Sequence, residues 1–301
     1  MAVVRIGPVI AAAASALLLA ALVPASAPAE PVHQFSFQLV DVTADGRFTA
    51  VFATRAFDTT GAPPPAMDEN TVRLPAGLEL RREFRRRQWW CDGRALIDAI
   101  TAGKPHRQRW VRAFSSPGPV LRRLARLGTR ADRRLIKAAR TCTRALIGRG
   151  RATVDARPAI AEEIPADVFL YLARPRPGAI ATIAAVGIPD PRAPIVRRNP
   201  ILADVRSLVS TSLVSDPSAD GRFGLKLVLP TGRISGFQVS LARLELRVPG
   251  LTVRRGGRTV FWMTRPTCPA SGLLTFEAFY GYPAPLEDVT RTFTLPCPRY
   301  G

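Results

Sequence analysis

The sequence predicts a mainly β protein, built as two tandem β-sandwich-like units with an α-helical insert in the first unit. Two observations carry this prediction. The segment Ala44–Phe48 (Ala-Asp-Gly-Arg-Phe) recurs at Ala219–Phe223, 175 residues later. Most segments with a clear period alternate apolar and polar residues, which is the pattern of strands with one face on a core and one in water. Many short strands separated by turn residues are typical of sandwich-like domains.

A second echo lies on nearly the same register and supports an internal repeat. Val72–Arg82 (Val-Arg-Leu-Pro-Ala-Gly-Leu-Glu-Leu-Arg-Arg) returns as Leu246–Arg255 (Leu-Arg-Val-Pro-Gly-Leu-Thr-Val-Arg-Arg), at an offset of 174 residues. We therefore place the first unit at residues 30–190 and the second at residues 195–301. Four prolines between residues 189 and 200 mark a linker between them.

Residues 1–29 have the features of a secretory signal peptide. Arg5 supplies a positive n-region, residues 9–22 form an apolar core, and Ala25-Ser26-Ala27 is a small-residue cleavage site. No later run of about 18 apolar residues is free of charge, so we expect no membrane span after cleavage. The expected location is extracellular or in the cell envelope.

Individual segments show the strand pattern. Residues 33–41, 244–248 and 292–295 alternate apolar and polar side chains, as half-buried strands do. Val168–Leu172 and Ala179–Val186 are instead continuous apolar runs, which fit central strands packed on both faces.

The two Asp-Gly pairs, at residues 45–46 and 220–221, predict matched hairpin turns. Asp41 and Asp216 each precede such a pair by four residues, which suggests calcium as an alternative. A calcium loop needs more oxygen ligands than these residues supply, so we favour turns.

Four cysteines in an exported chain indicate two disulfides. Three pairings are open, and the repeat favours one bridge for each unit, Cys91–Cys142 and Cys268–Cys297. Each bridge would close a loop of tens of residues, worth on the order of 3–4 kcal/mol in the chain-entropy model. A metal or redox site would need close Cys-x-x-Cys spacing, which the sequence lacks.

The first cysteine loop contains a segment, residues 92–141, that breaks the β pattern. Within it, Val120–Arg140 has apolar residues at helical spacing and basic residues between them, and Pro119 is suited to begin a helix. The second unit has nothing equivalent between its cysteines. We therefore expect an α-helical insert here.

The net charge of +20 is concentrated around this insert. Residues 81–151 hold 21 basic and 4 acidic residues, and the rest of the chain contributes only +3. Clustered arginine suits an anionic polymer, an amphipathic helix suits an anionic membrane, and Trp89 and Trp90 beside arginines suit stacking on bases or sugars. The competing interpretation is a solvated helical cap in an arginine-biased chain, since only three of the 43 basic residues are lysine.

For the insert itself we favour the solvated cap. If the insert has a partner, we expect an anionic cell-envelope polymer or lipid surface, and sequence-specific nucleic-acid binding is not expected. The candidate anion-binding residues are Arg85, Arg86, Arg87, Arg122, Arg123, Arg126, Arg130, Arg133, Arg134 and Lys137.

No catalytic or cofactor motif stands out. The two histidines, His33 and His106, have no second histidine or cysteine at metal-ligand spacing, and no nucleophile elbow or phosphate-binding loop is present. We expect no cofactor, and the leading hypothesis is a non-catalytic binding protein. The rival is an extracellular hydrolase of polysaccharide or ester with a site between the units, because distant carboxylates can meet in a fold.

The chain resembles a group of secreted, β-rich proteins with two disulfides from high-GC actinobacteria. The likeness lies in Asn70–Gly77 with a cysteine shortly after it, in Cys142 leading into Gly148–Val154, and in Leu274–Tyr280 between the last two cysteines. The resemblance implies a secreted β scaffold and no particular activity, so it transfers no site residues. The long arginine-rich insert departs from the pattern of the group.

Overall fold

The structure is a computed structural model, and it describes most of the chain after residue 30. The described residues are 31–43, 48–58, 67–81, 90–91, 141–142, 144–155, 162–199, 202, 207–229, 233–234, 237–238, 240–249, 252–255, 258–261, 263–264, 266–284 and 286–297. The predicted signal segment 1–29 and nearly all of the predicted helical insert 92–141 lie outside them. Among the described residues, no helix is long and apolar enough to cross a membrane.

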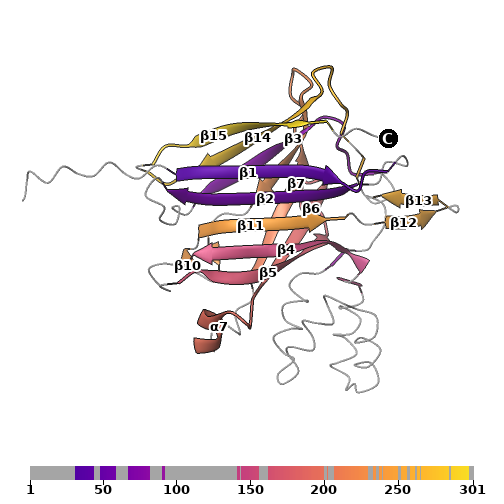
Figure 1. Ribbon diagram of the computed structural model, residues 1–301. Coiled ribbons are helices and arrows are strands. Elements are labelled where there is room, and N and C mark those ends of the chain that lie inside the picture. The colour runs from indigo at the N-terminus through magenta and orange to yellow at the C-terminus, as the bar shows by residue number, and fades with distance from the viewer. Residues whose placement is uncertain are drawn as a thin grey trace, which may run out of the picture. The chain divides into compact units, whose positions relative to one another are not determined.

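The molecule is mainly β, as predicted, and its centre is one eleven-stranded antiparallel sheet that is nearly closed and barrel-like (Figure 1). Its strands are β1 (Pro31–Val40), β2 (Thr49–Asp58), β3 (Glu69–Pro75), β4 (Leu146–Asp155), β5 (Ile164–Ala173), β6 (Ala181–Pro189), β7 (Ser207–Ser215), β8 (Phe223–Leu229), β11 (Ser240–Val248), β14 (Leu273–Gly281) and β15 (Val289–Pro296). Two small ribbons pair β9 (Arg233–Ile234) with β10 (Phe237–Gln238) and β12 (Thr252–Arg255) with β13 (Arg258–Phe261), and the one named helix of the described chain is α7 (Pro194–Arg198).

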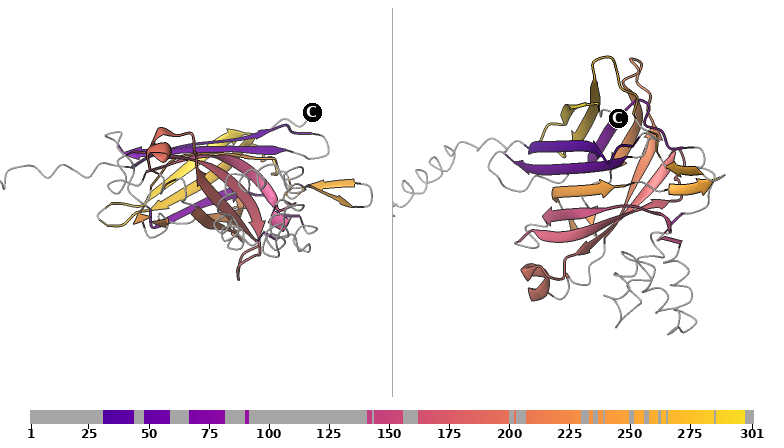
Figure 2. Two further views of the ribbon diagram at one scale, coloured as in Figure 1. Left: turned by 90° about the horizontal axis from the view of Figure 1, so that it is seen from below. Right: turned by 45° about the vertical axis from the view of Figure 1, so that its right-hand side comes forward.

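The prediction of two tandem sandwich-like units is not confirmed, because both predicted units contribute strands to this single sheet and each has one strand between strands of the other. The strand order is β1-β2-β11-β4-β5-β6-β7-β8-β3-β14-β15. Strand β11 of the predicted second unit lies between β2 and β4 of the first, and β3 lies between β8 and β14. Figures 1 and 2 show β11 as an orange strand between its indigo and magenta neighbours, β2 and β4. The proline-rich stretch predicted as a linker contains α7 and joins β6 to β7, which are neighbours in the sheet.

The two ends of the sheet have the same internal order. The two sets of five neighbouring strands are β1-β2-β11-β4-β5 and β7-β8-β3-β14-β15, and β6 lies between them. In each set the first, second, fourth and fifth strands come from one predicted unit in chain order, and the third strand comes from the other unit. The register matches as well, because Phe52 of β2 faces Leu246 of β11 while Leu227 of β8 faces Val72 of β3. Phe52 and Leu227 are 175 residues apart, and Val72 and Leu246 are 174 apart, which are the offsets of the two sequence echoes.

The core follows from the apolar patterns. Val168–Leu172 is buried along its whole length in β5, which confirms the prediction of a strand packed on both faces. Strand β6 is packed on both faces only in part, because buried and half-buried residues alternate along most of it. The inward face of β11 carries Leu244, Leu246 and Val248, and these pack against the main core cluster.

Aromatic side chains join the two ends of the sheet, β1 and β14–β15. The ring of Phe35 lies 4.6 Å from the ring of Phe293 and 6.1 Å from that of Phe276, and the Phe37 ring lies 4.6 Å from Phe276. Phe276 is fully buried. The described strand pairings include none between β1 and β15, so this junction, which we call the aromatic seam, is held by side-chain packing.

Gly150 permits the close pairing of β4 with β11. A Cβ atom at this position would overlap the carbonyl oxygen of Glu245 on β11 and would lie 2.8 Å from a methyl carbon of Leu246. A side chain cannot be placed there without moving one of the strands.

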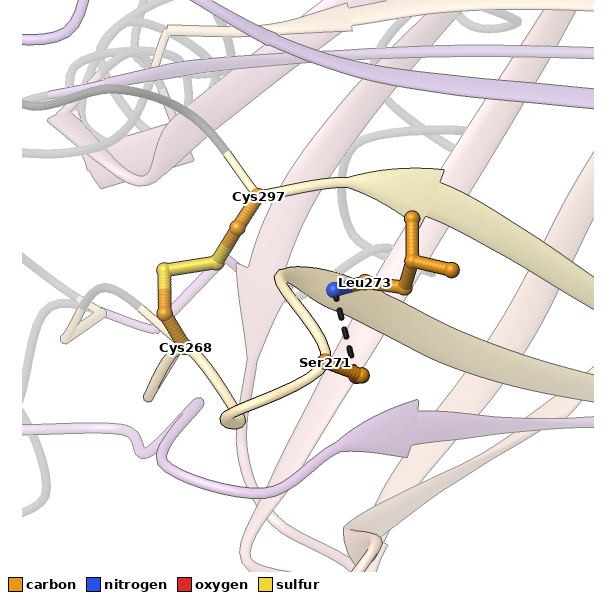
Figure 3. Close-up of a disulfide and its surroundings, with 4 residues drawn as sticks. All are labelled: Cys268, Ser271, Leu273 and Cys297. Carbon is orange, nitrogen blue, oxygen red and sulfur yellow. Dashed lines mark hydrogen bonds between the residues drawn. A yellow bond between two sulfur atoms is a disulfide. The ribbon is translucent and has the colours of Figure 1, made fainter.

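Both disulfides pair as predicted, Cys91 with Cys142 and Cys268 with Cys297. The first lies beside the end of β5, where the Cys91 N–H donates to the Leu172 carbonyl. The second joins the chain before β14 to the end of β15 (Figure 3), where the Leu273 N–H donates to the Ser271 hydroxyl at 3.3 Å. Disulfides of this kind are typical of an oxidising, extracellular environment.

The second Asp-Gly pair forms a hairpin turn, as predicted. Gly221 has a φ of +71°, which glycine adopts without steric cost, and the Asp220 carboxylate accepts the Arg222 N–H at 3.1 Å between β7 and β8. The first pair lies outside the described residues, although β1 and β2 on either side of it pair in a continuous antiparallel register.

Candidate anion-binding face

Five arginines lie on the outer face of three neighbouring strands, β2, β11 and β4. We call this surface the arginine face, and it consists of Arg55, Arg149, Arg151, Arg243 and Arg247. All five residues are exposed.

The strand period explains why these side chains point outward. In β11, Arg243, Glu245 and Arg247 are exposed, and the leucines between them are half-buried on the opposite face. In β4, Arg149 and Arg151 alternate with glycine and with buried Ala152. Successive strand residues point to opposite faces, so burial of the apolar set places every second residue in water.

The register places like charges directly opposite each other at two points. Arg149 of β4 faces Arg247 of β11, and Arg55 of β2 faces Arg243 of β11. Side chains opposite each other in an antiparallel pair have Cβ atoms about 5 Å apart, and like charges there destabilise the sheet.

Between these two pairs lies a row in which the charges alternate. Glu245 faces Arg151, and Arg151 faces Asp167 of β5 on its other side. Opposite charges across strands stabilise a sheet. The positive potential of the arginine face is therefore concentrated at the two arginine pairs.

Each arginine pair has one member held by an exposed carboxylate. The Arg247 guanidinium lies 2.8 Å from the Asp41 carboxylate, and Arg243 forms an ion pair with Glu245. The Arg55 guanidinium lies 5.1 Å from the centre of the Phe57 ring. Within the described ranges, no carboxylate lies at ion-pair distance from Arg149 or Arg55. Exposed ion pairs contribute about 0–1 kcal/mol, so a bound anion can replace them at low cost.

The predicted basic insert precedes β4 in the chain. Its ends are joined by the Cys91–Cys142 disulfide, and Cys142 is followed within a few residues by β4 with Arg149. The ten candidate residues predicted from the sequence, Arg85 to Arg87, Arg122 to Arg134 and Lys137 among them, all lie outside the described residues.

Sequence reasoning missed the arginine face because its members come from three separate segments. The alternation Arg243-x-Glu245-x-Arg247 was visible as the polar face of a strand, and Gly148-Arg149-Gly150-Arg151 was also visible. That Arg247 faces Arg149 depends on the insertion of β11 between β2 and β4, which no local pattern indicates.

A second group of polar side chains is buried at the aromatic seam. The His33 ring stacks on the Tyr280 ring at 3.7 Å, and His33 Nε2 is hydrogen-bonded to the Tyr282 hydroxyl. Burial, together with the charge of Arg291, lowers the pKa of His33 to about 4. Burial also raises the pKa of Tyr280 to about 12, with Arg291 opposing the shift, so the rings of His33 and Tyr280 are neutral at pH 7.

Asn70 adds an unusual feature to this region. It faces Tyr280 across β3 and β14, and its side-chain carbonyl oxygen is buried without a hydrogen-bond partner among the described residues. A serine–histidine pair would favour the hydrolase hypothesis, but the partner of His33 here is the Tyr282 hydroxyl.

Two carboxylates, Asp167 of β5 and Asp190 just after β6, lie close enough to interact. Burial, followed by the nearby charge of Asp190, raises the pKa of Asp167, while Arg151 and Arg192 oppose the shift. Asp167 is exposed on the outer face of the sheet. The adjacent carboxylates Glu162 and Glu163 are exposed before β5, and Glu162 accepts two hydrogen bonds from Arg198 at 2.7 and 2.9 Å.

The alternative calcium interpretation gains no support. Asp216 is bound by Arg73 at 2.7 Å, and this hydrogen bond is the main cause that lowers the pKa of Asp216. Arg73 also reaches Glu277 at 3.2 Å, and Asp41 is bound by Arg247. In the part of the chain that the structure describes, no three histidine, cysteine or acidic side chains gather as a metal site would require.

Comparison of the chain with protein-family models, with curated proteins and with solved structures gave no match.

Proposed function

We propose that this protein is an extracellular, non-catalytic module that binds an anionic polymer through the arginine face. The observation that carries the proposal is the placement of two arginine pairs directly opposite each other on exposed strands. Such pairs lower the stability of the free protein, and a bound anion relieves the repulsion. The guanidinium group is suited to this role because its fork of donors matches phosphate and carboxylate groups.

The chemistry of the face favours a polymer over a lipid surface. Binding to a membrane through a protein face requires apolar side chains that enter the interfacial region. In the described chain the exposed large apolar residues are Leu208 of β7 and Leu273 of β14, and neither strand belongs to the arginine face. The basic insert, tethered by Cys91–Cys142, would extend the same surface.

The extracellular location rests on two observations. Both cysteine pairs form disulfides, and residues 1–29 have the composition of a secretory signal. We also propose that the scaffold is a duplicated unit whose two copies exchanged their third strands, which is supported by the matching register of β2–β11 and β8–β3.

The test is the salt dependence of binding to long-chain polyphosphate and to a polyuronate, which separates phosphate from carboxylate. Five arginine contacts would weaken binding roughly 100- to 500-fold between about 50 and about 200 mM salt. The double variant Arg149→Gln, Arg247→Gln should reduce the slope of log affinity against log salt by about 1.4–1.8. The matched β8 control, Arg222→Gln in the turn before β8 with Lys226→Gln on the strand, removes the same charge and should leave the slope unchanged.

Three results would overturn the proposal. The first is absence of binding to either polymer at about 50 mM salt, where such contacts are strong. The second is binding to phosphatidylglycerol vesicles with no binding to polymer, which would indicate a lipid surface. The third is any result that places binding outside the arginine face. Either the β8 control lowers the salt slope as much as the Arg149/Arg247 variant does, or affinity is lost only when Arg122, Arg123 and Arg126 of the insert are replaced by glutamine.

A further inference from the structure

The two arginine pairs of the arginine face are separated along β11 by a fixed distance. Arg243 and Arg247 lie four residues apart on the same strand, and each has an arginine directly opposite it, Arg55 and Arg149 respectively. An antiparallel strand rises about 3.4 Å for each residue, so the pairs are about 14 Å apart.

The row between the pairs carries one more negative than positive charge. Glu245, Arg151 and Asp167 stand side by side on β11, β4 and β5 with alternating sign. An anion placed over this row would meet two carboxylates for one guanidinium. The exposed charge therefore divides into two positive positions with a less favourable position between them.

We propose that the arginine face binds two anionic groups of one polymer chain, one at each arginine pair, about 14 Å apart along β11. The inference rests on the proposed function and makes it more specific. Each position takes a phosphate or carboxylate group between two guanidinium forks, which can donate up to four hydrogen bonds. Asp41 and Glu245 release Arg247 and Arg243 to the ligand, because their exposed ion pairs are weak.

Two linked positions give a dependence on chain length. A ligand that reaches only one pair binds with the affinity of that pair. A ligand that spans both gains the effective concentration of its second group, which raises the affinity about 100-fold or more. Binding should therefore increase in a step once the ligand exceeds about 14 Å in extended length.

The experiment compares orthophosphate, tripolyphosphate and size-fractionated longer polyphosphates on the full chain at constant salt. We expect weak binding of the first two and a step of about 100-fold for chains that span both pairs. Either Arg149→Gln or Arg55→Gln should remove the step, because each destroys one pair. Arg151→Gln, with the same change in charge in the central row, should lower the affinity for long chains severalfold and keep the step.

The unfolding midpoint distinguishes a specific arginine pair from a general effect of positive charge. Arg149→Gln should raise the unfolding midpoint in the absence of polymer, because it removes repulsion from Arg247. If affinity rises smoothly with chain length and Arg151→Gln acts like Arg149→Gln, the two-position inference is wrong while polymer binding stands. If no polyphosphate binds at low salt, the proposed function itself fails.

Discussion

Gly150 illustrates how a single residue position depends on the neighbouring strand. The sequence suggests only that glycine weakens a strand or permits a close approach. The structure shows that the approach is to the Glu245 backbone, which leaves no space for a Cβ atom. Arg149 and Arg151 on either side of Gly150 point outward, so the same short segment serves both the close strand pairing and the arginine face.

His33 is the residue whose protonation should affect stability most directly. Its pKa is lowered to about 4 by burial and by Arg291, whereas an unfolded histidine has a pKa near 6.5. Between about pH 4 and about pH 6.5, His33 binds a proton in the unfolded chain and not in the folded chain. Stability therefore falls as the pH drops from about 6.5 to about 4, by on the order of 2–3 kcal/mol at the lower limit.

The measurement is chemical denaturation across this range of pH. The variant His33→Gln keeps a group that can bond the Tyr282 hydroxyl and removes the titration, so its stability should change much less between pH 6.5 and pH 4. The carboxylates of Asp216 and Asp220, with pKa values below their usual range, act at lower pH and leave this window clear. If the variant loses as much stability between pH 6.5 and pH 4 as the native chain, His33 is not the group responsible.

At the scale of elements, the aromatic seam is the junction that depends on side chains instead of backbone hydrogen bonds. Phe276 of β14 contacts both Phe35 and Phe37 of β1 and is fully buried. Phe276→Ala should cost about 3–5 kcal/mol, because it removes a large ring from a packed site. Amide exchange should accelerate first in β1 and β15, where the seam opens.

Phe169→Ala is a suitable comparison, because Phe169 is buried in the central strand β5. It should cost a similar free energy without selective opening of β1 and β15. The milder Phe276→Leu keeps the test usable if the alanine variant does not fold. Uniform loss of protection in both Phe276 variants would show that the seam does not behave as a separate element.

At the scale of the whole molecule, the position of β3 and β11 between strands of the other predicted unit should prevent the two predicted units from folding separately. Without β11, strands β2 and β4 lose the partner that joins them, and without β3 the same is true of β8 and β14. Fragments 30–190 and 195–301 should therefore each show little cooperative structure. Circular dichroism and the dispersion of amide chemical shifts in NMR spectra test this on each fragment alone. An equimolar mixture of the two fragments should regain the native spectrum. A fragment 30–190 that unfolds cooperatively alone would support separate units.

Much of the scaffold could be predicted from local pattern. The period of two in residues 33–41 and 244–248, the buried run Val168–Leu172 and the Asp-Gly turn at residues 220–221 all describe interactions between residues near in sequence. The cysteine pairing was favoured by the predicted repeat and is confirmed by the two disulfides. The candidate site could not be predicted in this way, because its charges approach each other only across strands that are distant in the chain.

The sequence by itself determined that this chain is mainly β and which faces of its strands are apolar, and it favoured one of three open cysteine pairings. These properties depend on side-chain period and composition, which are local. Only the tertiary structure decided that β11 lies between β2 and β4, and hence that Arg247 faces Arg149 and Arg243 faces Arg55. The physical reason is that strand pairing uses backbone hydrogen bonds, which are the same for every sequence, so the choice of partner depends on how the whole core packs.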